Sequence, residues 1–275
     1  MGYLSIDSIT VGTARYDNVP GGGALYGALG ARAAGADVSL LAACGDDFTQ
    51  DWLDALAEFG IDMSGVVRRE GPTRRARLAH GIDGGRASPH HGEGTWRERT
   101  EAMLPPLPEN LEADAIMLAP MPLAHVVRCI DQATGPLIVD TSEAFADEGL
   151  LPWLALLPQL DIFAPSREET RLLCPDRDDD NAVRVLAALG CDVVQKRGAD
   201  GLALCRAGSS RIVTCPAATT SVVDPTGAGD AVVGALASGL AHGLDLEDNA
   251  RQAARIGARA VTGIGAAAMC AGFGP

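Results

Sequence analysis

The clearest chemical signal in the chain is residues 222–230 (VVDPTGAGD), which an apolar helical pattern follows from Ala231 to His242. These residues predict the end of a strand, a glycine-rich turn and the start of a helix. Backbone N–H groups and the helix dipole at such a start favour an anion, for example a phosphate group in transfer. Asp230 falls in the first turn, where a carboxylate stays ionised and can accept the proton of an attacking hydroxyl. The alternative is a structural turn in which Asp230 is an ordinary helix-start residue.

Composition restricts the class of protein to which this segment belongs. The 275 residues are 47% apolar, enough to bury the core of one large domain and too apolar for intrinsic disorder. The net charge of −14 argues against bulk electrostatic binding of nucleic acid or of an anionic membrane. Lys196 is the only lysine and stands between Gln195 and Arg197, so the chain lacks a Gly-Lys-Ser/Thr phosphate loop.

The cysteines and the opening residues predict a cytoplasmic protein. The seven cysteines are scattered and never spaced as C-x-x-C, which favours reduced thiols over a disulfide framework or a zinc site. The first residues lack the basic start and the long apolar stretch of a signal peptide. No apolar run is long enough to span a bilayer.

Alternating strand and helix patterns predict how the chain positions these residues. Over residues 1–275 they indicate a single α/β domain, with a mostly parallel central sheet and helices on both faces. Ligands of such sheets bind beyond the carboxyl ends of the strands. Two polar stretches, approximately 11–20 and 68–99, break the alternation and predict a small antiparallel β flap that acts as a lid. The predicted strands are 38–43, 113–118, 137–139, 162–164, 193–195 and one ending at 222–223, with a hairpin of 202–205 and 211–214; the predicted helices are 47–59, 122–130, one from 166, 181–189, 228–242 and 246–261.

Residues 224–230 (DPTGAGD) resemble the C-terminal signature of the ribokinase-like, PfkB-type carbohydrate kinases. Other segments resemble motifs of that family in the family order, and the resemblance extends from Gly2 to about Gly265. These segments are 2–7 (the opening strand), 21–26 (the di-glycine signature), 164–169 (the N-x-x-E segment) and 193–201 (the nucleotide strand and turn). The resemblance implies a ribokinase-like fold and an ATP-dependent phosphotransferase that uses Mg²⁺ and a monovalent cation such as K⁺.

The same resemblance implies a role for each matching residue. Asp230 is then the general base, and the N–H groups of Gly227, Ala228 and Gly229 form the anion hole for the γ-phosphoryl group. Asp7, Gly22 and Gly23 contact the acceptor. The nucleotide is bound by Ser166, Lys196, Gly198 and Thr226, while Glu169 places Mg²⁺ through water and Asp224 helps to hold the monovalent cation.

Several of these residues also have a purely structural interpretation. Ser166 replaces the family's Asn, and Ser166-x-x-Glu169 has the form of a capping box, which explains both residues without a ligand. Lys196 is either a surviving lysine in an arginine-biased chain or an ammonium group that faces phosphates. Asp7, and also Asp140 at the end of another strand, can cap turns.

The acceptor is the least determined part of the prediction. The family resemblance implies a small sugar or polyol. The brief flap strands and the G-G-x-A-x-Y form of residues 21–26 resemble a short-chain branch that includes inositol-type kinases, which points to an inositol-like acceptor. A nucleoside kinase of the same fold is the alternative enzyme, and a catalytically lapsed protein that only binds a metabolite is the alternative outside catalysis. An arginine-rich run from Arg68 to Arg77, with His80, His90 and His91, either faces an anionic acceptor or forms a solvated strand face. The lids of this family often pair, so a homodimer is a further expectation.

Overall fold

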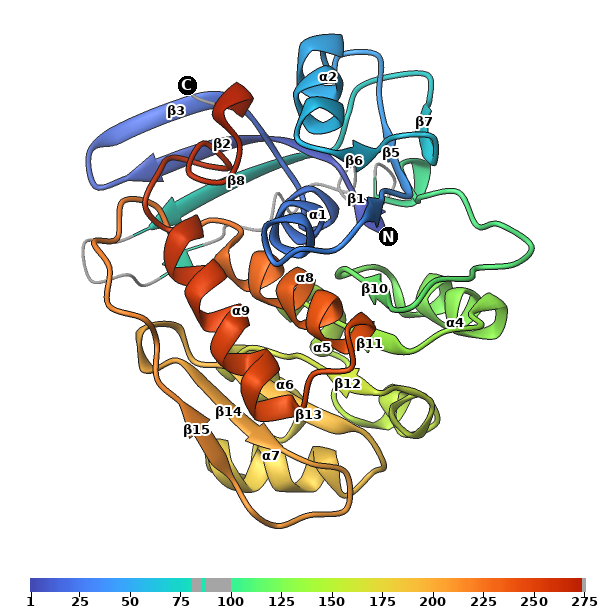
Figure 1. Ribbon diagram of the computed structural model, residues 1–275, viewed down its shortest axis with the longest axis vertical. Helices are drawn as coiled ribbons and strands as arrows, with labels where there is room; N and C mark the ends of the chain where they lie inside the picture. The colour runs from blue at the N-terminus through green and yellow to red at the C-terminus, as the bar shows by residue number, and fades with distance from the viewer. Residues whose placement is uncertain (81–85, 88–99, 274–275) are drawn as a thin grey trace.

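The central layer of the molecule is a sheet built from two sets of hydrogen-bonded strands (Figure 1). The computed structural model describes residues 1–80, 86–87 and 100–273. One set contains β1 (Gly2–Tyr3), β5 (Ala42–Cys44) and β7 (Val66–Arg68), and the other contains β10 (Ile116–Leu118), β11 (Leu137–Val139), β12 (Ile162–Phe163), β13 (Asp192–Lys196), β14 (Leu202–Cys205) and β15 (Val213–Cys215). The strands lie in the orders β1-β5-β7 and β10-β11-β12-β13-β14-β15.

The two sets continue one another at β1 and β10. The N–H group of Ala119, directly after β10, donates to the carbonyl of Met1, directly before β1, at 2.9 Å. The pairs are parallel from β10 to β13 and within the β1 set, whereas β14 and β15 pair antiparallel. The mostly parallel sheet predicted from the alternating pattern is confirmed, as is the terminal hairpin.

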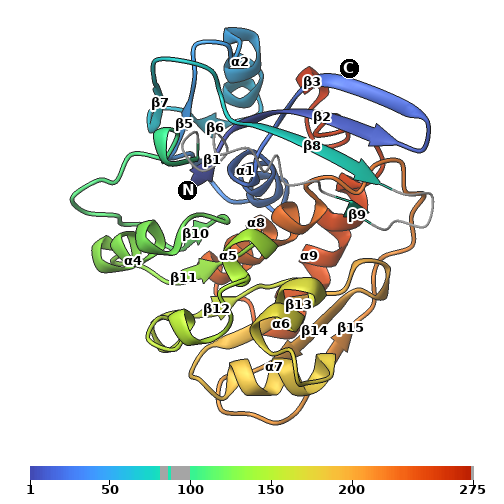
Figure 2. The same cartoon turned by 180° about the vertical axis from the view of Figure 1, so that it is seen from behind.

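Helices cover both faces of this sheet (Figure 2). One face carries α1 (Gly23–Ala33), α8 (Ala228–Ala241) and α9 (Leu246–Ala260), and the other carries α4 (Leu123–Gln132), α5 (Glu143–Ala146), α6 (Arg167–Leu173) and α7 (Asp179–Ala187). Strand β11 shows why both faces are needed. Leu137 and Val139 pack in the core with α4 and α7, whereas Ile138 packs in the core with α8 and α9. A strand that is apolar on both sides must be covered on both sides.

The remaining short elements complete the chain. Helix α2 (Gln50–Glu58) and the 3₁₀ turns η1 (Leu151–Trp153), η2 (Leu157–Gln159), η3 (Gly198–Asp200) and η4 (Ala271–Phe273) lie outside the sheet, and β4 (Val38–Ser39) pairs with β6 (Ile61–Asp62) alone. In the part of the chain that the structure describes, no helix is both long and apolar enough to cross a bilayer.

Helices α1 and α8 approach each other closely because glycine lines their contact. A methyl group on Gly30 would overlap the backbone of Ala231, and one on Gly234 would overlap the carbonyl of Gly27. This contact carries the beginning of α8 against the beginning of α1. It therefore brings the two glycine-rich segments of the sequence to one place.

The segments predicted to form a lid lie in a second sheet, called the lid below, in the order β3-β2-β8-β9. Its strands are β2 (Ser5–Val11), β3 (Ala14–Gly21), β8 (Arg75–His80) and β9 (Arg86–Ala87). The sheet is mixed rather than antiparallel, because β8 pairs parallel with β2, while β2 with β3 and β8 with β9 pair antiparallel. Arg68 belongs to the central sheet, and residues 81–85 and 88–99 of the predicted lid segment lie outside the described residues.

Three predicted elements are corrected by the structure. The opening strand breaks at Leu4, so that its first half joins the central sheet and its second half joins the lid. The strand predicted over 38–43 is two strands, β4 and β5, in different sheets. Residues 222–223 form no strand, because both valines are exposed and the N–H group of Val223 donates to the Val261 carbonyl instead of to a neighbouring strand. Tertiary context decides such short β-branched runs.

Candidate active site

The first turn of α8 begins without a side-chain cap. Its N-cap is Gly227, whose φ of 72° is the left-handed conformation that glycine adopts without strain. A methyl group at Gly227 would also overlap the ring of Tyr26. Of the N–H groups predicted to bind an anion, that of Ala228 lies 3.3 Å from the Pro225 carbonyl, at the long end of a hydrogen bond. The positive end of the helix dipole at this turn is not covered by a capping side chain.

Asp230 lies beside the di-glycine segment. A methyl group on Gly23 would come within 2.6 Å of Asp230 Oδ1. Gly22 has a φ of 102°, and a side chain there would overlap the carbonyl of Tyr3. Asp7, which is 3% exposed on lid strand β2, lies against Gly21. The structure thus brings the predicted base and the predicted acceptor contacts together.

Tyr26 lies among the carboxylates of this site. Burial raises the pKa of the Tyr26 hydroxyl well above its usual value. Negative charge from Asp7, Asp224 and Asp230 raises that pKa further. The sequence interpretation used Tyr26 only as part of a family pattern and missed this position under the turn of α8.

Lys196 approaches the same turn from β13. The end of its side chain, from Cδ to Nζ, lies 3.5–3.8 Å from where a methyl group on Gly229 would stand. Its Nζ donates to Asp140 Oδ1 at 2.5 Å, and Asp140 is 2% exposed directly after β11. Burial opposes the charge of Lys196, but the carboxylates of Asp140 and Glu169 outweigh burial and raise the lysine pKa. A fixed ammonium group therefore stands beside the start of α8.

Ser166 and Glu169 form the capping box of α6. Glu169 Oε2 accepts from the Ser166 N–H group at 2.6 Å, and Ser166 Oγ accepts from the Glu169 N–H group at 3.2 Å. Burial raises the pKa of the Glu169 carboxyl to about 8, which Lys196 opposes and Asp140 reinforces. The structural interpretation of both residues holds, and it leaves a buried carboxyl next to Lys196.

The same carboxyl groups suit a hard divalent cation. Mg²⁺ is usually bound by one or two carboxylates together with phosphate oxygens and waters. Glu169 and Asp140 meet that description, since both interact electrostatically with Lys196 and with each other. Within residues 1–80, 86–87 and 100–273, no group of three or more His, Cys, Asp or Glu side chains is arranged to hold a metal ion without such help.

Asp224 fixes the turn that precedes α8. It is completely buried, and its two oxygens accept from the N–H groups of Thr226 at 2.9 Å and Gly265 at 2.7 Å. His80 Nε2 lies 2.8 Å from Thr226 Oγ1 and 3.6 Å from Asp224 Oδ1. Both oxygens of Asp224, the predicted partner of a monovalent cation, therefore already accept hydrogen bonds from backbone donors.

His80 and its neighbours on β8 do not form a uniformly solvated face. Ala76, Leu78 and His80 are partly or fully buried, whereas Arg75 and Arg77 are exposed. The guanidinium group of Arg75 pairs with Asp47 at 2.7 Å. The solvated-face interpretation is therefore wrong for His80, and the period-two alternation of the segment was the signal that could have shown it.

The other predicted nucleotide contacts lie at the carboxyl ends of neighbouring strands. Ser166 follows β12 and forms an isolated parallel β-bridge with Lys196. The Lys196 N–H group donates to the Pro165 carbonyl at 2.8 Å. Gly198 opens the turn after β13 with a φ of 58°, and no atom stands within 4 Å of where its side chain would begin. This is the sheet edge at which ligands of α/β proteins bind.

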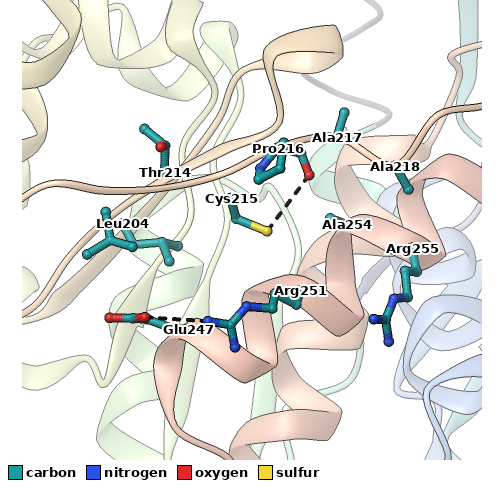
Figure 3. A pocket seen from close by; sticks show the side chains of 11 residues that line it. Leu204, Thr214, Cys215, Pro216, Ala217, Ala218, Glu247, Arg251, Ala254 and Arg255 are labelled. Atoms are coloured by element: carbon teal, nitrogen blue, oxygen red, sulfur yellow. Dashed lines mark hydrogen bonds and ion pairs between the residues drawn. The ribbon is translucent and has the colours of Figure 1, made fainter.

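A pocket of about 330 Å³ opens beside this edge, between β15 and α9 (Figure 3). Residues 215–218 form one wall, and Ala254 and Arg255 stand on the other. Arg251, one helical turn before Arg255, pairs with Glu247 at 3.6 Å. The lining is mainly apolar with a few charged side chains, as is common in pockets for small molecules.

Comparison with known proteins bears on the family and the fold. The family model described as pfkB family carbohydrate kinase matches residues 7–271. A cytidine kinase of Thermococcus kodakarensis is 28% identical over 91% of both chains, and a 2-dehydro-3-deoxygluconokinase of Thermoproteus tenax is 28% identical over 88% of this chain and 80% of its own. Among solved structures, a nucleoside kinase of Burkholderia thailandensis in complex with ADP-inosine has a TM-score of 0.79 at 19% identity, covering 96% of this chain and 88% of that one. A ribokinase from Thermotoga maritima has a TM-score of 0.70 at 21% identity, covering 98% and 92%. The ribokinase-like fold is confirmed.

Proposed function

Since the chain belongs to the pfkB family of carbohydrate kinases, we propose that it transfers the γ-phosphoryl group of ATP to a hydroxyl of a small acceptor, with Asp230 as general base. One observation carries this proposal. The Asp230 carboxylate lies between the acceptor-side glycine, Gly23, and the start of α8, where Lys196 lies against Gly229. A base, a glycine segment predicted to contact the acceptor and a cationic phosphate site thus meet at one helix terminus.

The residues of this chain suffice for each role in an in-line transfer. Asp230 Oδ1 accepts the proton of the acceptor hydroxyl as its oxygen attacks the γ-phosphorus and the bond to the bridging oxygen of ADP breaks. The N–H groups of Gly227, Ala228 and Gly229 and the ammonium group of Lys196 stabilise the charge on the transferred group. Mg²⁺, when held through Glu169 and Asp140, would neutralise charge on the phosphate oxygens.

The pocket in Figure 3 is the best place for the base of the nucleotide. Lys196 pairs with Leu202, and Leu202 pairs with Cys215 at the start of the pocket wall. Two strand spacings separate Lys196 from Cys215, about 10 Å, which a triphosphate chain can span. Gly198, with open space around it, lies along this path.

For the acceptor, a nucleoside is favoured over the sugar or polyol that the sequence pattern suggested. The cytidine kinase matches this chain over nearly its full length, and the structural neighbours include nucleoside kinases. A primary hydroxyl of the ribose would be the nucleophile. A sugar or sugar acid remains the second candidate, because of the similarity to the 2-dehydro-3-deoxygluconokinase.

An ATP-consumption screen tests this proposal. Purified protein with ATP, Mg²⁺ and K⁺ should turn over with at least one of the nucleosides, sugars, sugar acids, polyols or inositols offered, and nucleosides should give the highest kcat/KM. The Asp230→Asn variant should bind ADP but lose turnover. A wild-type protein that binds an acceptor and never phosphorylates it would instead support the lapsed, metabolite-binding alternative.

A further inference from the structure

His80 joins the lid to the turn that precedes α8. It is the last residue of lid strand β8 and is 7% exposed. Its Nε2 lies 2.8 Å from Thr226 Oγ1, across a sequence separation of 146 residues. No local sequence preference imposes such a contact, so the packing of the lid on the main domain creates it.

The partner of His80 belongs to the network that fixes the phosphate-side turn. Thr226 stands directly before Gly227, the N-cap of α8. Its own N–H group donates to Asp224, which is completely buried and also accepts from Gly265. A buried carboxylate needs such donors, and each one limits how far the turn can move. His80 brings a side-chain hydrogen bond from the lid into this network.

His80 shares one face of the lid with Asp7. The strands β2 and β8 pair in parallel, with Asp7 opposite Ala76. His80 is four residues beyond Ala76, about 13 Å along the strand, and side chains repeat every second residue, so Asp7 and His80 project from the same face. Asp7 reaches Gly21 and His80 reaches Thr226. Gly21 belongs to lid strand β3, so the Asp7 contact moves with the lid, whereas a rigid movement of the lid would displace the contact of His80 with Thr226.

We propose that His80 is a positioning residue that couples lid closure over the acceptor to the geometry of the phosphate-binding turn, an inference that rests on the proposed function. With the lid down, His80 holds Thr226 and thereby the N–H groups at the start of α8. With the lid raised, the turn loses this partner and the γ-phosphoryl group is less well aligned. Such coupling would restrict hydrolysis of ATP by water in the absence of an acceptor.

Three variants separate this role from a structural one. His80→Ala should lower kcat by about 10- to 100-fold, while the KM for the acceptor changes less than about threefold, because misplacement of a reacting group by a fraction of an ångström costs rate rather than binding. His80→Gln should retain most of the activity, since its amide reaches the position of Nε2. Arg77→Ala, on the opposite, exposed face of the same strand, is the matched control and should behave as wild type. A kcat of His80→Ala within twofold of wild type, or a His80→Gln variant as impaired as His80→Ala, would overturn the proposal.

A double-mutant cycle with Thr226→Val identifies the contact itself. If His80 acts through the Thr226 hydroxyl, adding His80→Ala to Thr226→Val should cost little further kcat and little further loss in the unfolding midpoint. Fully additive effects would contradict the coupling. The unfolding cycle requires no substrate. Lack of turnover by the wild-type protein with every acceptor therefore refutes the proposed function, whereas an additive unfolding cycle refutes the role of His80.

Discussion

Helices α8 and α9 pack side by side, yet they begin in opposite ways (Figure 1). Helix α9 begins at Asp245, whose carboxylate accepts from the N–H groups of Glu247 and Asp248. Helix α8 begins at Gly227, which has no side chain to offer. Both helices carry an aspartate at the third helical position, Asp248 in α9 and Asp230 in α8. The aspartate at this position is therefore an ordinary helix-start residue in α9 and a candidate catalytic base in α8.

The difference shows what marks a helix start as a site. A missing cap is insufficient, because α4 also begins without a side-chain cap. The start of α8 is distinguished by what other elements bring to it: Lys196 lies against Gly229, and Gly23 lies against Asp230. A glycine at this position also forgoes roughly a few tenths of a kcal/mol of stability compared with a capping side chain. Function, rather than stability, explains that arrangement on the proposed mechanism.

The largest expected effect comes from replacing Asp230 and Asp248 in separate variants. Asp230→Asn should lower kcat by about 10² to 10⁴, because the amide cannot accept the proton of the acceptor hydroxyl. Asp248→Asn, at the equivalent position of α9, should leave kcat and KM unchanged. Steady-state phosphorylation assays with the best acceptor measure both. Equal residual activity in the two variants would remove the distinction between the helices.

The next effect concerns the ammonium group beside α8. Lys196→Met should lower kcat/KM for ATP by about 10- to 100-fold, since a preorganised charge at the transferred group is lost. Arg197→Met removes the same charge from the adjacent position, where the guanidinium group faces Gln195 and Asp180, and should have little kinetic effect. Unfolding midpoints of both variants, measured beside the kinetics, separate lost stability from lost catalysis. A kinetic loss in Arg197→Met as large as in Lys196→Met would count against a specific role for Lys196.

How far the sequence predicts this site depends on the range of each contact. The turn and helix at residues 224–241 follow from local pattern, and so does the capping box of Ser166 and Glu169. The meeting of Lys196 with Gly229, and of His80 with Thr226, depends on tertiary packing across distant segments. No spacing within the sequence encodes such contacts, so a family pattern could suggest the first pair and nothing suggested the second.

The fold prediction also succeeded where the local sequence pattern is long, and it was wrong where tertiary contacts decide the structure. Long periodic helices and the buried strands of the main sheet match their sequence patterns. The errors fall where a short apolar run changes partners. The break at Leu4 and the exposed residues 222–223 are decided by which neighbouring strand is available, and a two-residue pattern carries no such information.

The start of helix α6 combines features of the starts of α8 and α9. The pH dependence of folding stability should show this. Its Glu169 closes a capping box but is also buried beside Asp140, and its pKa is raised to about 8 from an unfolded value of 4.5. Between these values the unfolded chain has lost the proton that the folded protein keeps, so folding stability falls as pH rises. Relative to Glu169→Gln, the wild type should therefore lose several degrees of unfolding midpoint from pH 5 to pH 8 and change little above that. A wild type that gains relative stability over this range would show that the carboxyl is charged in the folded protein.

The smallest expected effect concerns the N-cap of α9. Asp245→Ala removes the cap that holds the N–H groups of Glu247 and Asp248, and should lower the unfolding midpoint by about 2 °C while kcat and both KM values stay unchanged. The backbone hydrogen bonds from Asp248 and Glu247 hold the pKa of Asp245 below its usual value. The advantage of the wild type should therefore be present at neutral pH and disappear on acidification through that lowered pKa. Asp245→Asn, which keeps an accepting oxygen, is the matched control and should retain most of the stability. Loss of kcat in Asp245→Ala would show that the start of α9 affects the active site. The proposed contrast between a structural start in α9 and a functional start in α8 would then not hold.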